Sequence, residues 1–484
     1  MPTLPLAQGF YVDEAVNLSN QECLNLIPAY LETQGALNPD ALRAPAGLVT
    51  FSDANGEGAC RGAIRFQNEL YTVHGDRFYH VASDGTKTAI GASIPGTNRV
   101  RMAENGVTIT VIVPGTATGF FFDSTLGTFV EIVDAVFIDY GIKLDVCFNN
   151  GFFVYITATE FFLSSLSVEN NGKDFNGLDF STADVDTDDN TACITIKNEL
   201  YICGRTTIQV FGITANDFPF LPIPGATVDR GVLGAEMIID FQNRYLFIGA
   251  GKNEGITIWE GISGESRRLS SPSIDNILQN LPREDLNNAF SFKYSESGNF
   301  FCGFTIPNQL TLIYDQTSSN MAGRPIWHRR ASSQTDSGVF RGSHVVQVYG
   351  EILVCDAIDG RIGRIDLGVF TEYDDLVLRR FNTVYVQAEG ERFTVPRVEI
   401  KSQLGISEIM TLAANMPEIT FRISEDGGVN FYDIDTQALP LSPSSIVRNA
   451  FFRIGQFEYS LAMQFDVLTD QKITFTKLTM GAAL

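Results

Sequence analysis

Residues 198–212 read Asn-Glu-Leu-Tyr-Ile-Cys-Gly-Arg-Thr-Thr-Ile-Gln-Val-Phe-Gly, which is two short apolar runs on either side of a polar turn. Side chains in each run alternate between two faces, as they do in β-strands. Residues 68–81, Asn-Glu-Leu-Tyr-Thr-Val-His-Gly-Asp-Arg-Phe-Tyr-His-Val, follow the same order; they turn at Gly75, as the first stretch turns at Gly204. Both stretches therefore predict an antiparallel hairpin.

The same hairpin pattern recurs along the chain. Looser copies begin at Asn105, Asn150, Asn243, Gly298 and Tyr349, which with the first two makes seven. Their spacing is close to the length of one four-stranded propeller blade, about 40 to 50 residues. A blade cannot bury both faces of its sheet alone, so successive blades stack face to face around an axis. We therefore predict an all-β chain whose residues 46–370 form a β-propeller of about seven blades, with a range of six to eight. An irregular β-sandwich stays the alternative, because its hairpins would look the same.

The regions on either side of the repeats have a different character. After Asp366 the strands lengthen and alternate polar with apolar residues, as in residues 380–386, 392–400, 418–423 and 472–478. This period of two predicts a β-sandwich-like C-terminal domain over residues 371–484. Residues 1–45 lack the repeat and are expected to form an N-terminal arm or partner-packing segment. The one clear helical pattern covers residues 274–289, with Ser273 as its expected cap and Pro282 interrupting it.

The composition limits the possible functions. The chain has 57 acidic and 34 basic residues and a formal charge of −23, which argues against a basic nucleic-acid-binding face. No stretch approaches the ~18 uninterrupted apolar residues of a membrane span, and the first residues lack a secretion signal. We therefore expect synthesis in a cytoplasm and no membrane span. The seven cysteines are scattered and contain no Cys-x-x-Cys pair, so free buried thiols are expected.

Residues 184–190, Asp-Val-Asp-Thr-Asp-Asp-Asn, place carboxylates at the first, third and fifth positions of a calcium-loop pattern. The rest of the pattern fails, because Asp189 replaces the turn glycine and Thr195 replaces the bidentate glutamate. A solvated acidic loop and a divalent-ion site both remain open for this stretch.

Residues 424–431, Ser-Glu-Asp-Gly-Gly-Val-Asn-Phe, follow the spacing of the Asp-box, Ser-x-Asp-x-Gly-x-Thr-Trp. The role of that motif is structural, because Ser and Asp bond the turn backbone and the glycines take positive φ. The stretch therefore predicts another hairpin, although the Asp-box also occurs in sialidase propellers.

The sequence contains no recognisable catalytic, cofactor-binding or metal-ligating set. Its histidines, His74, His80, His328 and His344, lack metal-ligand spacing, and neither a nucleophile elbow nor a phosphate loop is present. The arginine pairs at 267/268, 329/330 and 379/380 are isolated in an acidic chain, so salt bridges at an interface are expected there rather than phosphate contacts. We predict that the chain is not an enzyme and uses no cofactor.

Several short segments resemble the packaged-DNA stabilisation proteins of short-tailed bacteriophages, which are also called tail accessory, hub or nozzle proteins. Near the start these segments are residues 47–51, 60–62, 69–75, 94–96 and 100–106; near the end they are 398–405, 424–428 and 448–455. The resemblance covers residues 20–466 and is strongest at the two ends. One departure is Asn430-Phe431, where the family more often has Thr-Trp.

The resemblance implies a virion protein of the phage tail, with six copies forming a ring below the portal and adaptor proteins. Such a ring would extend the DNA channel, help to retain packaged DNA and contact tail fibre, tailspike or needle proteins. Duplex DNA would pass through its lumen without sequence-specific binding, and an acidic lining would let the duplex slide. The alternative is a sialidase-like propeller that processes or binds glycans, such as a receptor-binding tail protein.

Overall fold

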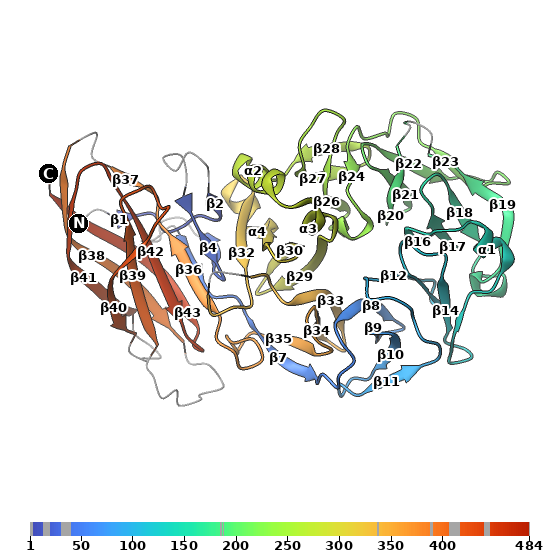
Figure 1. The fold of residues 1–484 in the computed structure, drawn as a ribbon, viewed down its shortest axis with the longest axis horizontal. Coiled ribbons are helices and arrows are strands. Elements are labelled where there is room, and N and C mark those ends of the chain that lie inside the picture. The colour runs from blue at the N-terminus through green and yellow to red at the C-terminus, as the bar shows by residue number, and fades with distance from the viewer. Residues whose placement is uncertain are drawn as a thin grey trace.

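The computed structural model describes residues 3–12, 20–30, 40–183, 186, 188–335, 338–387, 391–405, 417–439 and 446–483. These residues form two bodies side by side. One is a ring of small antiparallel sheets, on the right of Figure 1, and the other is a two-layered β-sandwich, on the left. The fold is therefore all-β, with a β-propeller and an added sandwich, as the repeats and the later alternating strands predict.

Within the described ranges the ring consists of seven blades, which take the strands of the chain in order. Blade one is β8 (Cys60–Phe66), β9 (Glu69–His74), β10 (Arg77–Val81) and β11 (Lys87–Ile90); blade two is β12 (Arg101–Glu104), β13 (Thr108–Ile112), β14 (Gly119–Asp123) and β15 (Thr128–Glu131); blade three is β16 (Asp145–Asn149), β17 (Phe152–Ile156), β18 (Phe161–Ser164) and β19 (Phe175–Ser181); blade four is β20 (Asn190–Ile196), β21 (Glu199–Gly204), β22 (Ile208–Ile213) and β23 (Phe220–Pro222). Blade five is β24 (Gly231–Val232), β25 (Ile238–Phe241), β26 (Arg244–Ala250), β27 (Thr257–Ile262) and β28 (Glu265–Arg268); blade six is β29 (Phe290–Glu296), β30 (Asn299–Ile306), β31 (Leu310–Asp315) and β32 (Ile326–Arg330); blade seven is β33 (Gly342–Val348), β34 (Glu351–Asp356), β35 (Ile362–Asp366) and β7 (Gly47–Ser52).

The seven repeat positions found in the sequence mark the turn between the two innermost strands of each blade. At five of these turns both central residues have positive φ: Gln67/Asn68, Asn150/Gly151, Gln242/Asn243, Ser297/Gly298 and Tyr349/Gly350. Positive φ at both positions is the requirement of the type I′ turn, and Asn and Gly adopt it at little cost. The backbone conformation of these turns therefore explains why Asn or Gly recurs at them.

The last blade is completed by a strand from the beginning of the propeller. Strand β7 pairs antiparallel with β35, so Gly47 lies opposite Asp366 and Val49 lies opposite Arg364. Gly47 is required because a Cβ atom there would lie 2.1 Å from the carbonyl oxygen of Thr371. Pairing between the first and the last strand closes the ring without leaving a free end between them.

Aromatic side chains fill the spaces between blades. Phe78 of blade one stacks on Phe129 of blade two, with 4.5 Å between ring centroids and 8° between the planes. Phe120 and Phe122 of blade two belong to the same buried cluster. Flat rings suit the narrow gap between two facing sheets, and the 37 phenylalanines of the chain are used extensively in this way.

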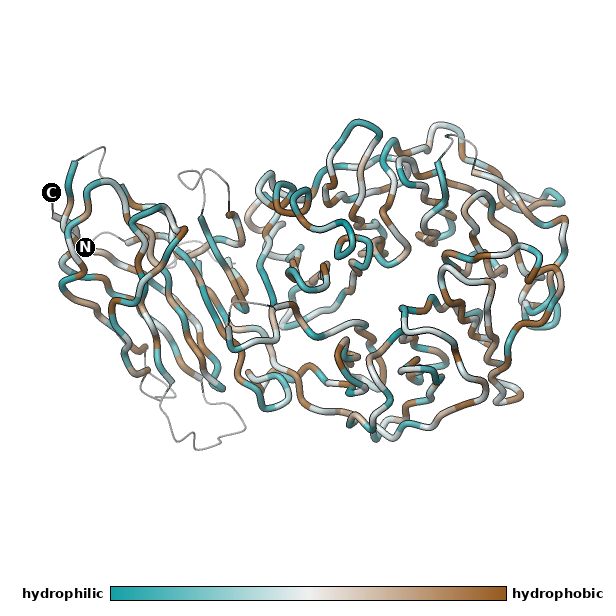
Figure 2. Tube along the Cα trace, viewed as in Figure 1, coloured by the Kyte–Doolittle hydropathy of each residue, from teal (hydrophilic) through white to brown (hydrophobic). Residues whose placement is uncertain are grey.

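The sandwich combines strands from both ends of the chain. One layer runs β41 (Ile446–Phe457), β38 (Phe393–Leu404), β43 (Ile473–Ala483), β6 (Asp40–Arg43) and β5 (Ile27–Tyr30), with β1 (Thr3–Leu4) also on β43. The other layer runs β4 (Cys23–Leu24), β36 (Leu378–Asn382), β42 (Ser460–Leu468), β39 (Glu418–Ser424) and β40 (Tyr432–Ala438), with β37 (Val386–Gln387) also on β42. Hydrophobic and hydrophilic residues alternate along these strands in Figure 2. Strands before residue 45 thus pair with strands after residue 370, while the proposed division at those two residues stays a prediction.

Strand β4 also joins the sandwich to the ring. It pairs with β36 on one side and, through Leu24 and Arg329, makes a parallel bridge to β32 of blade six on the other. Asn25 strengthens this junction, because its side-chain amide donates to the carbonyl oxygens of Ala331 and Leu378 at 2.9 and 2.8 Å. The two bodies are therefore joined by main-chain pairing as well as by side chains.

The predicted helical region forms two helices, α2 (Pro272–Asn280) and α3 (Arg283–Asn287), and Pro282 separates them as expected. The expected cap was wrong by two residues. Ser271, not Ser273, caps α2, because its hydroxyl accepts from the Ile274 N–H and Pro272 takes the first helical turn. Helices α1 (Ala135–Asp139) and α4 (Gln316–Ala322) are not predicted by the sequence, because each is too short to show a helical periodicity.

Candidate functional site

The inner ends of the blades surround a cavity of about 650 Å³ on the propeller axis. Polar side chains that line it include Arg61, Arg99, Glu236 and Asn190. The sequence analysis named none of these as site residues. The sequence nevertheless pointed to this region. Of the segments that carry the family resemblance, 60–62 contains Arg61 and 100–106 directly follows Arg99.

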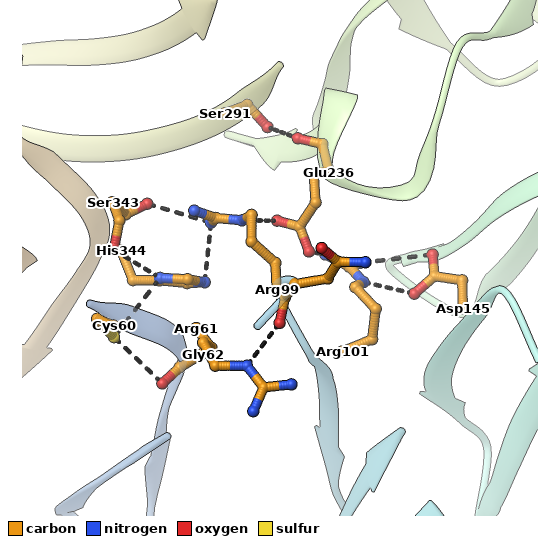
Figure 3. Close-up of polar contacts among 11 residues, drawn as sticks. Cys60, Arg61, Gly62, Arg99, Arg101, Asp145, Glu236, Ser291, Ser343 and His344 are labelled. Carbon is orange, nitrogen blue, oxygen red and sulfur yellow. Dashed lines mark hydrogen bonds and ion pairs between the residues drawn. The ribbon is translucent and has the colours of Figure 1, made fainter. Parts of the chain in front are cut away.

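A chain of charged groups crosses the axis (Figure 3). Arg99 Nε lies 3.0 Å from Glu236 Oε2, and Arg101 Nη1 lies 3.2 Å from Glu236 Oε1. Arg101 Nε in turn lies 2.6 Å from Asp145 Oδ1. Because Arg101 begins β12, Asp145 begins β16 and Glu236 precedes β25, the chain connects blades two, three and five through the centre of the ring.

Burial and the attraction between opposite charges shift the pKa values of these groups in opposite directions. Burial alone would raise the pKa of Glu236, but Arg99, Arg101 and His344 outweigh it and lower the pKa to about 2. Burial likewise opposes the charge on Arg101, and Asp145 and Glu236 overcome it and raise the Arg101 pKa. Glu236 and Arg101 are therefore ionised at neutral pH, each beside a group of opposite charge.

Arg99 also contacts His344 of blade seven. Its Nη2 donates to the ring Nε2 at 2.9 Å and to the Ser343 carbonyl oxygen at 3.3 Å. On the other side of its imidazole, His344 Nδ1 lies 3.9 Å from Cys60 Sγ of blade one. Together with the ion pairs, these contacts extend the network to the seam between the first and last blades.

Arg61 is buried beside this network but meets main-chain oxygens instead of carboxylates. Its guanidinium group donates to the carbonyl oxygens of Gly75, Asn98 and Pro95 at 2.6, 2.6 and 2.8 Å. Burial lowers the Arg61 pKa. The residue therefore fixes the loop that connects blade one to blade two.

The axial groups satisfy one another and stabilise the ring from inside. In the part of the chain that the structure describes, no three His, Cys, Asp or Glu side chains are arranged to hold a metal ion. The arrangement is that of a structural network, and the absence of catalytic and cofactor-binding residues stays a prediction.

The acidic loop at residues 184–190 lies partly outside the described residues, which omit Asp184, Val185 and Thr187. Asp186 lies 2.6 Å from Lys252 Nζ. Asp188 accepts from the main-chain N–H groups of Thr206 and Thr207, at 2.6 and 3.1 Å. Two of the carboxylates in the calcium-loop pattern are therefore engaged by the protein itself, which favours the loop interpretation over an ion site.

The Asp-box-like stretch forms the predicted hairpin, between β39 and β40. Asp426 Oδ1 accepts from the main-chain N–H groups of Val429 and Asn430 at 3.0 Å each, and Ser424 Oγ accepts from the Gly428 N–H at 2.7 Å. Gly427 and Gly428 have φ of 82° and 87°. The turn lies in the sandwich, not in a propeller blade.

Each of the three arginine pairs is held within the chain. In the first pair Arg267 contacts Glu260 and Arg268 contacts Asp275; in the second Arg329 pairs with Glu22 and Arg330 with Glu372; in the third Arg379 donates to the carbonyl oxygens of Thr469 and Phe370 while Arg380 pairs with Asp466. Five of the six arginines form ion pairs within the chain, whereas Arg379 binds carbonyl oxygens; salt bridges at an interface stay a prediction.

The four histidines occupy different surroundings. His80 lies 3.0 Å from Glu69 Oε2, on the hairpin that also contains His74. His328 is enclosed in blade six, where burial lowers its pKa to about 3. His74 and His344 both lie at the seam of blades one and seven, a proximity that spacing along the chain could not reveal. The seven cysteines are free, and all except Cys147 are buried, in agreement with the expectation.

None of the helices in the described segments has the length and apolar character that crossing a membrane requires.

Comparison with known proteins identifies relatives of the chain. The family model described as "Bacteriophage P22 Gp10, beta-propeller" matches residues 2–369. The tail hub protein gp10 of Salmonella phage P22 is 21% identical over 417 residues, and the match covers 84% of each protein.

Solved propeller structures are also similar in part. The β-propeller domain of Cps50 (Swd1) from Myceliophteria thermophila matches with a TM-score of 0.39 and 8% identity, covering 66% of this chain and 99% of that domain. The C-terminal WD40 domain of Sif2 matches with a TM-score of 0.38 and 11% identity, with the same shares covered.

Proposed function

Because the chain belongs to the β-propeller family of bacteriophage P22 Gp10, we propose that it is a nozzle or hub subunit in the tail of a short-tailed phage. The family supports a structural role in a phage tail. In the finer proposal six copies form a ring below the portal and adaptor, and the ring extends the DNA channel and helps to retain packaged DNA. Adaptor proteins and tail fibre, tailspike or needle proteins are the proposed partners.

One observation supports an assembly of several copies in a ring, namely that the centre of each propeller is closed. Arg99, Glu236 and Arg101 bridge its centre, and the cavity there is only about 650 Å³. Duplex DNA cannot pass through such a centre. A channel for DNA must therefore form between copies of the chain, which favours an assembly around a common axis over a single propeller threaded by DNA.

The charge of the chain supports the same proposal. Each copy carries a formal charge of −23, so a ring of copies presents a predominantly acidic inner surface unless it gathers its basic residues there. An acidic lining makes few phosphate contacts, and the duplex can slide along it. Retention of DNA would then depend on closure of the tube and not on affinity.

The junction between the two bodies also suits a ring subunit. The parallel bridge between Leu24 and Arg329 and the amide contacts of Asn25 join sandwich and propeller into one unit. Cyclic rings use two different surfaces of each subunit, which meet head to tail and must keep a fixed angle for the ring to close. A rigid junction would hold that angle.

The alternative of a sialidase-like enzyme receives less support. Such an enzyme needs a cluster of arginines open to a glycan carboxylate. The arginines on this axis are instead occupied, Arg99 by Glu236 and Arg101 by Glu236 and Asp145.

Mass photometry of the purified protein, alone and mixed with the adaptor of the same phage, tests the proposal. We expect a species of six chains, either alone or once the adaptor is present. A sialoside hydrolysis assay run in parallel separates the alternatives. A protein that stays monomeric with adaptor and cleaves sialosides would contradict the tail-ring function.

A further inference from the structure

Two cysteine–histidine pairs face each other where the ring closes. In blade one, Cys60 on β8 lies opposite His74 on β9. In blade seven, His344 on β33 lies opposite Cys355 on β34. The two blades are neighbours only because the ring is closed, so four residues from both ends of the propeller meet at this seam.

The two sulfur atoms share one environment. Cys60 and Cys355 belong to a single buried cluster with Leu353 and Ile362. The thiol of Cys60 is also within reach of the Gly62 carbonyl oxygen, at 3.4 Å. Cys355 is fully buried and Cys60 is 4% exposed. Both cysteines are free. The two cysteines of the seam therefore lie in one buried cluster that spans the first and last blades.

His344 is oriented toward this pair by Arg99. The guanidinium group donates to Nε2 at 2.9 Å, so Nε2 is the acceptor and the neutral ring carries its proton on Nδ1. Nδ1 lies 3.0 Å from Ser343 Oγ and 3.9 Å from Cys60 Sγ. A polar N–H group close to sulfur favours the thiolate, which is the reactive form of cysteine.

The electrostatic surroundings distinguish the two sulfurs. Burial alone would raise the pKa of Cys60, but the hydrogen bonds from Cys355 and His344 and the proximity of His74 lower it well below the usual range. The hydrogen bond to Cys60, together with burial, raises the pKa of Cys355. The lower pKa of the pair therefore belongs to Cys60 and the higher pKa to Cys355.

A small reagent can approach Cys60 from the axis. Cys60 lines the cavity of about 650 Å³ between the blades, together with Arg61 and Ser343. The cavity holds water-sized molecules, and hydrogen peroxide is scarcely larger than water.

A second pair of cysteines provides a comparison within the same chain. Cys147 on β16 and Cys193 on β20 also belong to one cluster, across blades three and four. Burial raises the pKa of Cys193, and Cys147 and Asp145 raise it further. Both pairs of cysteines are therefore close together. Only in the Cys60–Cys355 pair do the surroundings lower the pKa of one cysteine.

We propose that Cys60 and Cys355 form a peroxide-reactive dithiol whose oxidation links blade one covalently to blade seven. The Cys60 thiolate attacks one oxygen of hydrogen peroxide, the O–O bond breaks, and hydroxide leaves and takes up a proton to become water. Cys60 is then a sulfenic acid. The Cys355 sulfur attacks the Cys60 sulfur, the S–O bond breaks, and a second water leaves with the Cys355 proton. The two thiols are oxidised by two electrons, and one peroxide is reduced to two waters.

The covalent link would strengthen the closure of the ring. At present the seam depends on the pairing of β7 with β35 and on packing between blades. A reducing cytoplasm would leave the thiols free, and a protein outside the cell would meet oxidants. The inference rests on the side chains at the seam and does not require the proposed tail function.

The test treats the full-length native protein with hydrogen peroxide under conditions in which it stays folded, then blocks the remaining thiols and measures intact mass. We expect an early product that takes up two blocking groups fewer than the untreated protein, and a non-reducing digest in which the Cys60 peptide is joined to the Cys355 peptide. The seam should oxidise faster than the Cys147–Cys193 pair by about tenfold or more, because the thiolate fraction governs the first step. The oxidised protein should also melt at a higher temperature.

Two variants check the order of the steps. Cys355→Ser should stop the reaction at a Cys60 sulfenic acid, which a cyclic 1,3-diketone traps. His344→Phe should slow oxidation of Cys60, and Cys302→Ser, in blade six, should leave the seam reaction unchanged. Preferential oxidation of Cys147 and Cys193, or recovery of Cys60 in its reduced form, would overturn the proposal. Tight uptake of one zinc ion with protection of both seam thiols would overturn it as well, by assigning the four residues to a metal.

Discussion

Arg330 and Glu372 form a buried ion pair at the junction of the two bodies, with 3.4 Å between Nη2 and Oε1. The same Nη2 donates to the carbonyl oxygen of Ala46 at 3.1 Å, and the Ala46 N–H donates to Glu296 at 2.8 Å. Ala46 lies where the chain enters the propeller, and Glu372 lies where it leaves. One guanidinium group thus holds both connections between propeller and sandwich.

Replacing Arg330 by Met should destabilise the protein by about 3 to 5 kcal/mol, because the buried Glu372 carboxylate loses its partner. Urea unfolding followed by fluorescence measures the loss. Arg392→Met is the matched control, since the Arg392–Glu458 pair is largely exposed and should contribute no more than about 1 kcal/mol. Equal losses in the two variants would show that the Arg330 contact does not hold the junction.

Limited proteolysis should cut the native protein first in the acidic stretch 170–190, and propeller and sandwich should remain together. The reason is that strands β1, β4 and β6 before the propeller pair with strands after it. Mass spectrometry of early fragments identifies the cleavage sites. A clean separation near residue 370 into two stable halves would refute the close docking of the two bodies.

Removing the Glu236 charge should loosen the propeller axis. In Glu236→Gln, Arg99 and Arg101 lose their shared carboxylate, and we expect a loss of about 2 to 4 kcal/mol at neutral pH. The folded pKa of about 2 lies below the ordinary value of 4.5, so this contribution is complete above pH 4.5 and disappears as the pH falls toward 2. The free energies of unfolding of wild type and variant should therefore converge in acid. A difference that persists unchanged at low pH would mean that charge is not its cause.

The Asp426 turn should be important for stability and not for catalysis. Asp426→Ala removes the acceptor of two main-chain N–H groups and should cost about 1 to 3 kcal/mol through the lost hydrogen bonds. Thermal unfolding measures the effect. Asp435→Ala, at an exposed position of the same hairpin, is the control. An Asp426 variant with an unchanged melting temperature that had lost a glycosidase activity would contradict the structural assignment.

Duplex DNA should bind the purified protein weakly or not at all. The formal charge of −23 repels phosphates, and only charges within a Debye length of ~8 Å of the duplex act on it at physiological salt. Binding to a short duplex is measured from about 50 to 200 mM salt, where phosphate contacts show a steep dependence. Tight association that weakens steeply with salt would reveal a basic contact surface and exclude the sliding mechanism.

The sequence by itself determined the seven hairpins of the repeat. Each hairpin is encoded locally, by alternating apolar residues and by turn residues such as Asn68 and Gly151 that tolerate positive φ. The Asp-box-like turn was equally readable, because Ser424 and Asp426 bond main-chain groups only a few residues away. Local hydrogen bonding and local strand alternation leave a signal in a short window of sequence.

Only the tertiary structure decided how the ends of the chain are used and which polar residues meet on the axis. The pairing of β7 with β35 and the entry of β5 and β6 into the sandwich join segments separated by hundreds of residues, and no short window records such a pairing. Arg99, Glu236 and His344 likewise come from three different blades. Each looks like an ordinary polar residue in its own repeat. Their partnership arises because closing the ring brings the inner ends of all blades to one axis, where buried charges must be paired.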